Sequence, residues 1–141
     1  ASCKLRNVYL HNAMEEGESL GDGTNVFDIV TTYDVLHDAP NPAELIGQVK
    51  RALKKDTGLW LLGDIPSLPT MRENIAMPGG GTFFAFSTCL CMSCSLSTKD
   101  GAGLGTLGFT VPVATKMLRE GGFEHVDVLV EIKNVRWFVV S

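Results

Sequence analysis

The first half of the chain contains three apolar segments that predict strands and one stretch whose apolar spacing predicts a helix. Residues 7–11 and 27–33 mix β-branched and aromatic residues, a pattern typical of strands. Residues 59–64 are apolar with almost no alternation, which favours a parallel strand buried on both faces. Between the last two segments, apolar residues recur at helical spacing: Leu45, Ile46, Val49, Ala52 and Leu53. Strand, helix and strand in this order predict a βαβ unit.

Local signals mark both ends of the helix in this unit. Asn41 is a residue type that accepts a hydrogen bond at a helix N-cap, and Pro42 suits the first helical position. The sequence Asp-Thr-Gly at 56–58 ends the helix, because glycine and small polar residues favour a turn. The helix is therefore predicted to begin at Pro42.

The second half of the chain has a less regular pattern. Residues 82–96 contain neither Gly nor Pro and predict a buried helix, whereas the glycine-rich residues 101–108 predict a flexible loop. A further helix is predicted over 113–120, where Gly-Gly follows. Residues 126–132 and 135–140 flank a Lys-Asn turn and predict a hairpin.

Composition and charge limit the class of protein. The 141 residues are 45% hydrophobic and 20% charged, which is typical of one globular domain. A formal net charge of −4 argues against a nucleic-acid partner, since such proteins carry clustered Lys and Arg. The longest uncharged stretch, 74–98, contains glycines and hydroxyl residues and argues against a membrane span. The first residues do not resemble a secretory signal, so we expect a cytoplasmic protein.

Three of the four cysteines, Cys89, Cys91 and Cys94, form a C-x-C-x-x-C pattern. Such spacing occurs in metal sites, but no second Cys or His group lies nearby in the sequence to complete four ligands. We therefore predict buried, unreactive thiols and no metal site.

Several segments together carry a resemblance to a known family. Residues 27–38 (FDIVTTYDVLHD) and the turn LKKDTG at 53–58 resemble the fourth strand, acidic motif and following turn of class I S-adenosylmethionine-dependent methyltransferases. Residues 101–106 and 117–123 are similar to one subgroup, whose members carry an N-terminal winged-helix domain. The predicted terminal hairpin matches the family's last two strands. The resemblance extends over about residues 7–140.

The resemblance implies an α/β fold: a Rossmann-like methyltransferase sheet, mostly parallel, that ends in an antiparallel hairpin. The family's strand order is 3-2-1-4-5-7-6, and its first two strands and glycine-rich loop would precede residue 1. Residues 1–141 are therefore expected to form the C-terminal half of a catalytic domain and to bind cofactor weakly when alone. An upstream segment or a second chain would supply the missing part, and a homodimer is a separate open alternative.

The implied cofactor is S-adenosylmethionine. Asn12 and Ala13 would end the third strand, with Asn12 facing the adenine amino group. Tyr33 and Asp34 end a strand, where ligands bind in open α/β sheets. Asp34 would lie near the methionine end of the cofactor and Tyr33 beside the sulfonium, since a cation is attracted to an aromatic face. In the alternative interpretation, Asp34 only caps a turn.

His37 is the candidate catalytic residue. If the methyl acceptor is a hydroxyl, a base must take its proton, and histidine titrates near neutral pH. The pair His37-Asp38 also resembles the His-Asp pair of small-molecule O-methyltransferases, in which the histidine is the base. Alternatively, His37 is a structural residue bonded to a neighbouring backbone group. Asp64 ends the next strand. In one interpretation it orients His37 or the acceptor, and in the other it caps a turn.

Three functional hypotheses follow. The first is methyl transfer from S-adenosylmethionine to a small-molecule acceptor, with residues 82–96 lining the acceptor side. The second is an NAD(P)-binding Rossmann-type protein, because Gly103, Gly105 and Gly108 match G-x-G-x-x-G. That motif requires a strand directly before it and a helix opening at the third glycine, neither of which the sequence predicts. The third is a non-catalytic methyltransferase-like module that needs a partner chain.

Overall fold

A computed structural model describes residues 24–132 and 135–141 of the chain. Four strands form one mixed sheet in the order β1-β2-β4-β3. The strands are β1 (Ile29–Tyr33), β2 (Leu59–Asp64), β3 (Val126–Ile132) and β4 (Val135–Val140). The helices are α1 (Pro42–Ala52), α2 (Met71–Ala76), α3 (Gly80–Phe86), α4 (Met92–Ser95) and α5 (Val111–Glu120), and a π-helical segment, η1 (Ser87–Cys91), joins α3 to α4.

The sheet has the predicted topology. β1 and β2 are parallel, and β4 is antiparallel to both β2 and β3. This order corresponds to 4-5-7-6 in the predicted family order, so the α/β fold class and the terminal hairpin are confirmed. The strand predicted over 7–11 lies outside the described residues, as do Asn12 and Ala13.

The helix of the βαβ unit begins where the local signals predict, and it ends at Ala52, before the predicted Asp-Thr-Gly turn at 56–58. The side chain of Asn41 accepts a hydrogen bond from the backbone N–H of Glu44 at 3.1 Å, and Pro42 is the first helical residue. The predicted apolar stripe is buried at Ile46, Val49 and Ala52. Burial of this face holds α1 against the sheet and sets the crossover between β1 and β2.

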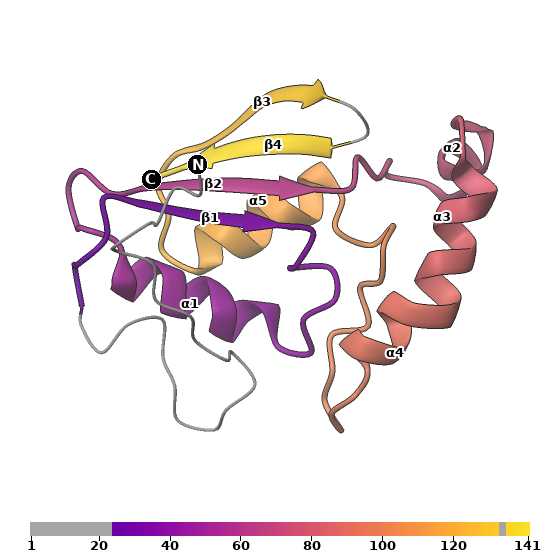
Figure 1. Ribbon diagram of the computed structural model, residues 1–141, viewed down its shortest axis with the longest axis horizontal. Coiled ribbons are helices and arrows are strands. Elements are labelled where there is room, and N and C mark those ends of the chain that lie inside the picture. The colour runs from indigo at the N-terminus through magenta and orange to yellow at the C-terminus, as the bar shows by residue number, and fades with distance from the viewer. Residues whose placement is uncertain (1–23, 133–134) are drawn as a thin grey trace, which may run out of the picture.

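Both long helices, α1 and α5, lie on the same face of the sheet (Figure 1). The core lies between them and the strands, and Trp60 and Leu62 of β2 are fully buried there. Its other buried members include Leu36, Ile46, Val49, Leu53, Phe109, Ala114, Leu118, Phe123, Phe138 and Val140. One apolar layer therefore accounts for the packing of the sheet against its helices.

The opposite face of the sheet is only partly covered, which corrects the prediction that β2 is buried on both faces. Leu59 of β2 is 40% exposed, and Ile29 and Tyr33 of β1 are 56% and 58% exposed. No described helix lies on that face (Figure 1). The described residues therefore leave apolar side chains of β2 on this face partly exposed, although the continuous apolar pattern of the strand predicts burial on both faces.

The prediction of a buried helix over 82–96 is wrong in its continuity and its burial. The segment comprises α3, η1 and α4, with Phe86 and Leu90 about half exposed. In Figure 1 it forms a helical arm beyond the carboxyl ends of β1 and β2. The lack of Gly and Pro predicts helical backbone but does not determine which surface covers it.

No helix in the described part of the chain is long and apolar enough to cross a membrane.

Gly63 offers a test of the packing on the open face of the sheet. A Cβ at Gly63 would lie 2.9 Å from the ring of Trp137, which covers this glycine. We expect Gly63→Ala to lower the free energy of unfolding by about 1–3 kcal/mol, because overpacking displaces the ring. Gly47→Ala is the matched control: its Cβ meets only the mobile end of Arg51, and the helical position should gain about 0.5–1 kcal/mol. Urea unfolding of both variants would show shifts of opposite sign if this packing is correct.

Candidate functional site

The carboxyl ends of β1 and β2 meet at one edge of the sheet. Tyr33 is in register with Gly63, and the backbone N–H of Asp34 donates to the carbonyl of Gly63 at 2.9 Å. Tyr33, Asp34 and Asp64 therefore lie at a shared edge, as the sequence predicts for two neighbouring parallel strands. The helical arm lies beyond the same edge (Figure 1).

The backbone turns sharply directly after β1. Asp34 has φ of 59°, in the left-handed region that few residues other than glycine adopt. Aspartate is among the residues that tolerate this conformation. Beyond the turn, Leu36 is buried in the core and His37 lies 2% exposed beside the end of β2. This turn brings His37 back to β2.

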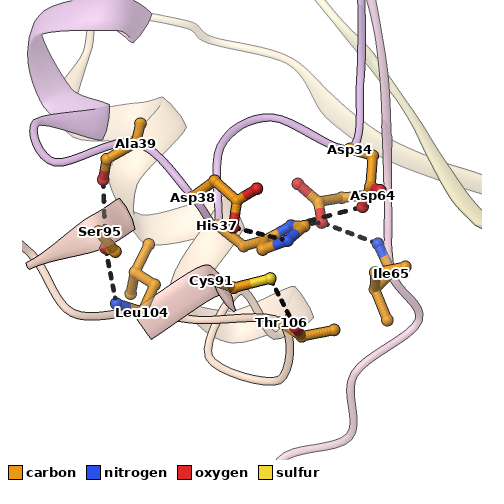
Figure 2. Close-up of polar contacts among 10 residues, drawn as sticks. All are labelled: Asp34, His37, Asp38, Ala39, Asp64, Ile65, Cys91, Ser95, Leu104 and Thr106. Atoms are coloured by element: carbon orange, nitrogen blue, oxygen red, sulfur yellow. Dashed lines mark hydrogen bonds and ion pairs between the residues drawn. The ribbon is translucent and has the colours of Figure 1, made fainter. Parts of the chain in front are cut away.

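His37 and Asp64 form a buried pair (Figure 2). The Nδ1 atom of His37 lies 2.7 Å from Oδ1 of Asp64, and the side chains are 2% and 1% exposed. The same oxygen accepts a hydrogen bond from the backbone N–H of Ile65 at 2.8 Å. Asp64 therefore both caps a turn and orients the imidazole. The bond of His37 is to a carboxylate, whereas the structural alternative expected a backbone group.

Two further carboxylates face the imidazole of His37. Oδ1 of Asp34 lies 3.6 Å from Nδ1, and Oδ1 of Asp38 lies 3.2 Å from Nε2. Oδ1 of Asp38 and Oδ2 of Asp64 are buried and have no hydrogen-bond partner among the described residues. The edge therefore concentrates negative charge and unused acceptor atoms around one histidine.

This environment shifts the pKa values of both His37 and Asp34. Burial alone would lower the pKa of His37, but the hydrogen bond to Asp64 and the charges of Asp64, Asp38 and Asp34 raise it above its ordinary value. Burial raises the pKa of Asp34, with further increases from Asp64 and Asp38, while His37 opposes the shift. The site therefore favours a protonated imidazole at a higher pH than a free histidine would.

The glycine-rich residues 101–108 pack against the segment after β1 that carries His37. The backbone N–H of Gly105 donates to the carbonyl of His37 at 3.1 Å, and that of Ala102 donates to Pro40 at 2.9 Å. Gly105 has φ of +64°, and a Cβ there would lie 2.6 Å from Oγ of Ser87, so the close approach requires glycine. The loop thus holds the position of the segment that carries His37.

The loop does not have the arrangement of a dinucleotide-binding motif. Helix α4, rather than a strand, precedes it, and α5 begins at Val111, beyond Gly108. The phosphate-binding motif needs a helix N-terminus at its third glycine. The NAD(P) interpretation of Gly103, Gly105 and Gly108 is therefore not supported by the structure.

The three clustered cysteines differ in their surroundings. Cys91 is buried and accepts a hydrogen bond from Oγ1 of Thr106 at 2.9 Å, whereas Cys89 and Cys94 are exposed. The prediction of three buried thiols is therefore wrong for Cys89 and Cys94. The arm is helical but mostly solvated, and of its three cysteines only Cys91, which faces the His37 segment, is covered.

The position of Cys91 is the feature that sequence reasoning missed. Its Sγ, a nitrogen of His37 and a carboxylate oxygen of Asp38 all lie within 4.8 Å of one another (Figure 2). Cys91 is distant from His37 and Asp38 in the sequence, so spacing gave no signal of this contact. The predicted site residues Asp34 and His37 lie together with Asp64, whereas Tyr33 lies at the same strand end with its ring centroid 6.0 Å from that of Trp137.

Comparison with known proteins supports the fold. No family model and no curated protein matches the sequence. Among solved structures, an O-methyltransferase candidate from Nostoc punctiforme aligns with a TM-score of 0.60 and 21% identity over 84% of this chain and 32% of its own. The structure titled PigF with SAH aligns at 0.56 and 17% identity over 81% of this chain and 30% of its own. An O-methyltransferase family protein from Burkholderia thailandensis aligns at 0.53 and 21% identity, with 81% and 30% covered.

The chain therefore has part of the Rossmann-like fold of class I S-adenosylmethionine-dependent methyltransferases. It spans about a third of the length of these solved structures. The structural alignments show the fold, and identities near 20% leave the reaction to be argued from the site.

The raised pKa of His37 predicts how the buried pair changes stability with pH. A group whose pKa is raised on folding contributes stability below its unfolded value, near 6.5 for histidine, and loses that contribution as pH rises through the raised value. We therefore expect wild type to exceed His37→Gln in free energy of unfolding by more at pH 6 than at pH 9. Urea unfolding across this range measures the gap, and a gap that is constant or widens with pH would contradict the assigned ionisation.

Proposed function

We propose that this chain forms part of a methyltransferase site that transfers a methyl group from S-adenosylmethionine to a small-molecule acceptor. The supporting observation is the shared edge of β1 and β2, where Asp34, His37 and Asp64 meet. Open α/β sheets bind ligands at the carboxyl ends of their strands, and the chain has part of a methyltransferase fold.

The residues at this edge fit the charged end of the proposed cofactor. S-adenosylmethionine supplies an electrophilic methyl group on a positively charged sulfur. Asp34 has a carboxylate that is 46% exposed, and the neighbouring Tyr33 is 58% exposed. A carboxylate and an aromatic face both attract a cation, the latter by roughly 0.5–2 kcal/mol. In this proposal they hold the methionine part of the cofactor, and Asn12 and Ala13 contact the nucleoside.

His37 would act as the base through Nε2. The hydrogen bond to Asp64 favours the tautomer with its proton on Nδ1, which leaves the Nε2 lone pair free. The bound cofactor would supply the methyl group to the acceptor oxygen and leave as S-adenosylhomocysteine, while Nε2 of His37 would take the proton of the acceptor hydroxyl. Because His37 is 2% exposed, the acceptor reaches Nε2 only if Asp38, 39% exposed and 3.2 Å away, moves aside. Asp64 is thus a positioning residue, and Asp38 separates the imidazole from solvent.

The proposed enzyme needs residues beyond those described. Strand β1 is at an edge of the described sheet, and its exposed Ile29 and Tyr33 lie on the uncovered face. An exposed apolar edge strand favours pairing with another strand. In our proposal an upstream segment or a second, different chain pairs with β1 and supplies the family's cofactor-binding glycine-rich loop, which residues 1–141 lack.

Cofactor binding tests the proposed use of the edge. We expect the 141-residue chain to bind S-adenosylhomocysteine weakly in calorimetry and to show no thermal shift with NADP. Asp34→Asn should weaken that binding, because it removes the charge nearest the proposed methionine end. Asp56→Asn is the matched control, an exposed aspartate in the turn before β2, at the other end of the strand. Tight binding by the chain alone would refute the need for a completing segment, and equal effects of the two variants would refute the role of Asp34.

The role of Asp64 predicts a distinctive pH profile. With the chain joined to whichever completing segment restores turnover, kcat should rise with pH through the raised pKa of His37, because the base must be neutral. Asp64→Asn removes the hydrogen-bonded charge, so the midpoint should move to lower pH. His37→Gln should reduce kcat by roughly 10²- to 10⁴-fold. Unchanged turnover in His37→Gln would remove the base assignment and leave a structural pair.

A further inference from the structure

A second set of side chains meets at the same histidine from the opposite side. Nε2 of His37 lies 3.2 Å from Oδ1 of Asp38, and Sγ of Cys91 completes a group whose ligand atoms all lie within 4.8 Å of one another. Figure 2 shows the three side chains converging from the segment after β1 and from η1. A sulfur, an imidazole nitrogen and a carboxylate oxygen are the donor types that bind Zn²⁺.

The distances are close to those of a metal site. Bond lengths of about 2.0–2.3 Å in a tetrahedral zinc site place neighbouring ligand atoms about 3.3–3.7 Å apart. The His37–Asp38 separation of 3.2 Å is just below this range, and the separations that involve the Cys91 sulfur are at most 4.8 Å, so that sulfur would need to move by about 1 Å at most. Oδ1 of Asp38 is buried and has no hydrogen-bond partner among the described residues, so it is available as a ligand.

Two of the three ligands also have supporting partners. Nδ1 of His37 is held by Asp64 at 2.7 Å, the arrangement in which a carboxylate orients a metal-binding histidine. Oγ1 of Thr106 donates to Sγ of Cys91 at 2.9 Å, a contact that favours the thiolate over the thiol.

We propose that His37 Nε2, Asp38 Oδ1 and Cys91 Sγ bind a zinc-class cation, and that the bound cation inhibits methyl transfer. Three protein ligands leave a fourth position for water or another small ligand. The inhibition rests on the proposed function, because the cation would occupy the lone pair that His37 needs as a base. The binding itself depends only on the three ligands.

Binding is tested on the 141-residue chain with Co²⁺ and Zn²⁺ and needs no turnover. We expect Co²⁺ to produce a thiolate-to-metal charge-transfer band at one equivalent, and Zn²⁺ to displace it. Cys91→Ser should abolish the band and weaken Zn²⁺ binding at least about tenfold, and Asp64→Asn should weaken it about 10- to 100-fold. Cys89→Ser and Cys94→Ser are matched controls on the same arm, both at exposed thiols, and should bind as wild type does.

The outcomes separate binding from function. If Cys91→Ser retains the band or the wild-type affinity, or if a control variant loses it, the site is refuted. Asp38→Asn provides a second ligand variant at a part-exposed side chain, should Cys91→Ser fail to fold by circular dichroism. Where turnover is restored, Zn²⁺ should inhibit wild type and Cys94→Ser, with reversal by EDTA. Zn²⁺ that binds at the site without slowing turnover would refute inhibition and leave the site intact.

Discussion

The hydrogen bond between His37 and Asp64 is the interaction on which the geometry of the site depends. It joins the segment after β1 to the end of β2 across a distance of 2.7 Å, in surroundings from which water is nearly excluded. Removing one partner of a buried charged pair typically costs about 3–5 kcal/mol, since the other partner stays buried without compensation. The pair therefore fixes the imidazole, its tautomer and its distance from Asp34 and Asp38.

The same histidine has two chemically distinct sides. Nδ1 faces Asp64 and Asp34, which hold it, while Nε2 faces Asp38 and the buried thiol of Cys91. Proton transfer and metal binding both require the neutral imidazole with a free Nε2, so they compete for one lone pair. The electrostatics of the edge thus control both proposed activities through a single protonation equilibrium.

The βαβ unit and the terminal hairpin could be predicted because their signals are local. Capping by Asn41, the helical spacing of Ile46 and Val49, and the strand-forming runs all act within a few residues. The shared edge of Tyr33, Asp34 and Asp64 followed from the parallel pairing of β1 and β2. The helical arm was less predictable, because its backbone conformation is local but its burial depends on which surfaces come to cover it.

By itself, the sequence determined the order of strands and helices, the class of fold and the edge at which chemistry would gather, because hydrophobic spacing and turn residues specify these locally. Only the tertiary structure decided which atoms meet there: that Asp64 binds His37, that Gly105 supports its backbone, and that Cys91 faces it. These contacts join residues far apart in the chain, and their distances follow from how the sheet, arm and loop pack together.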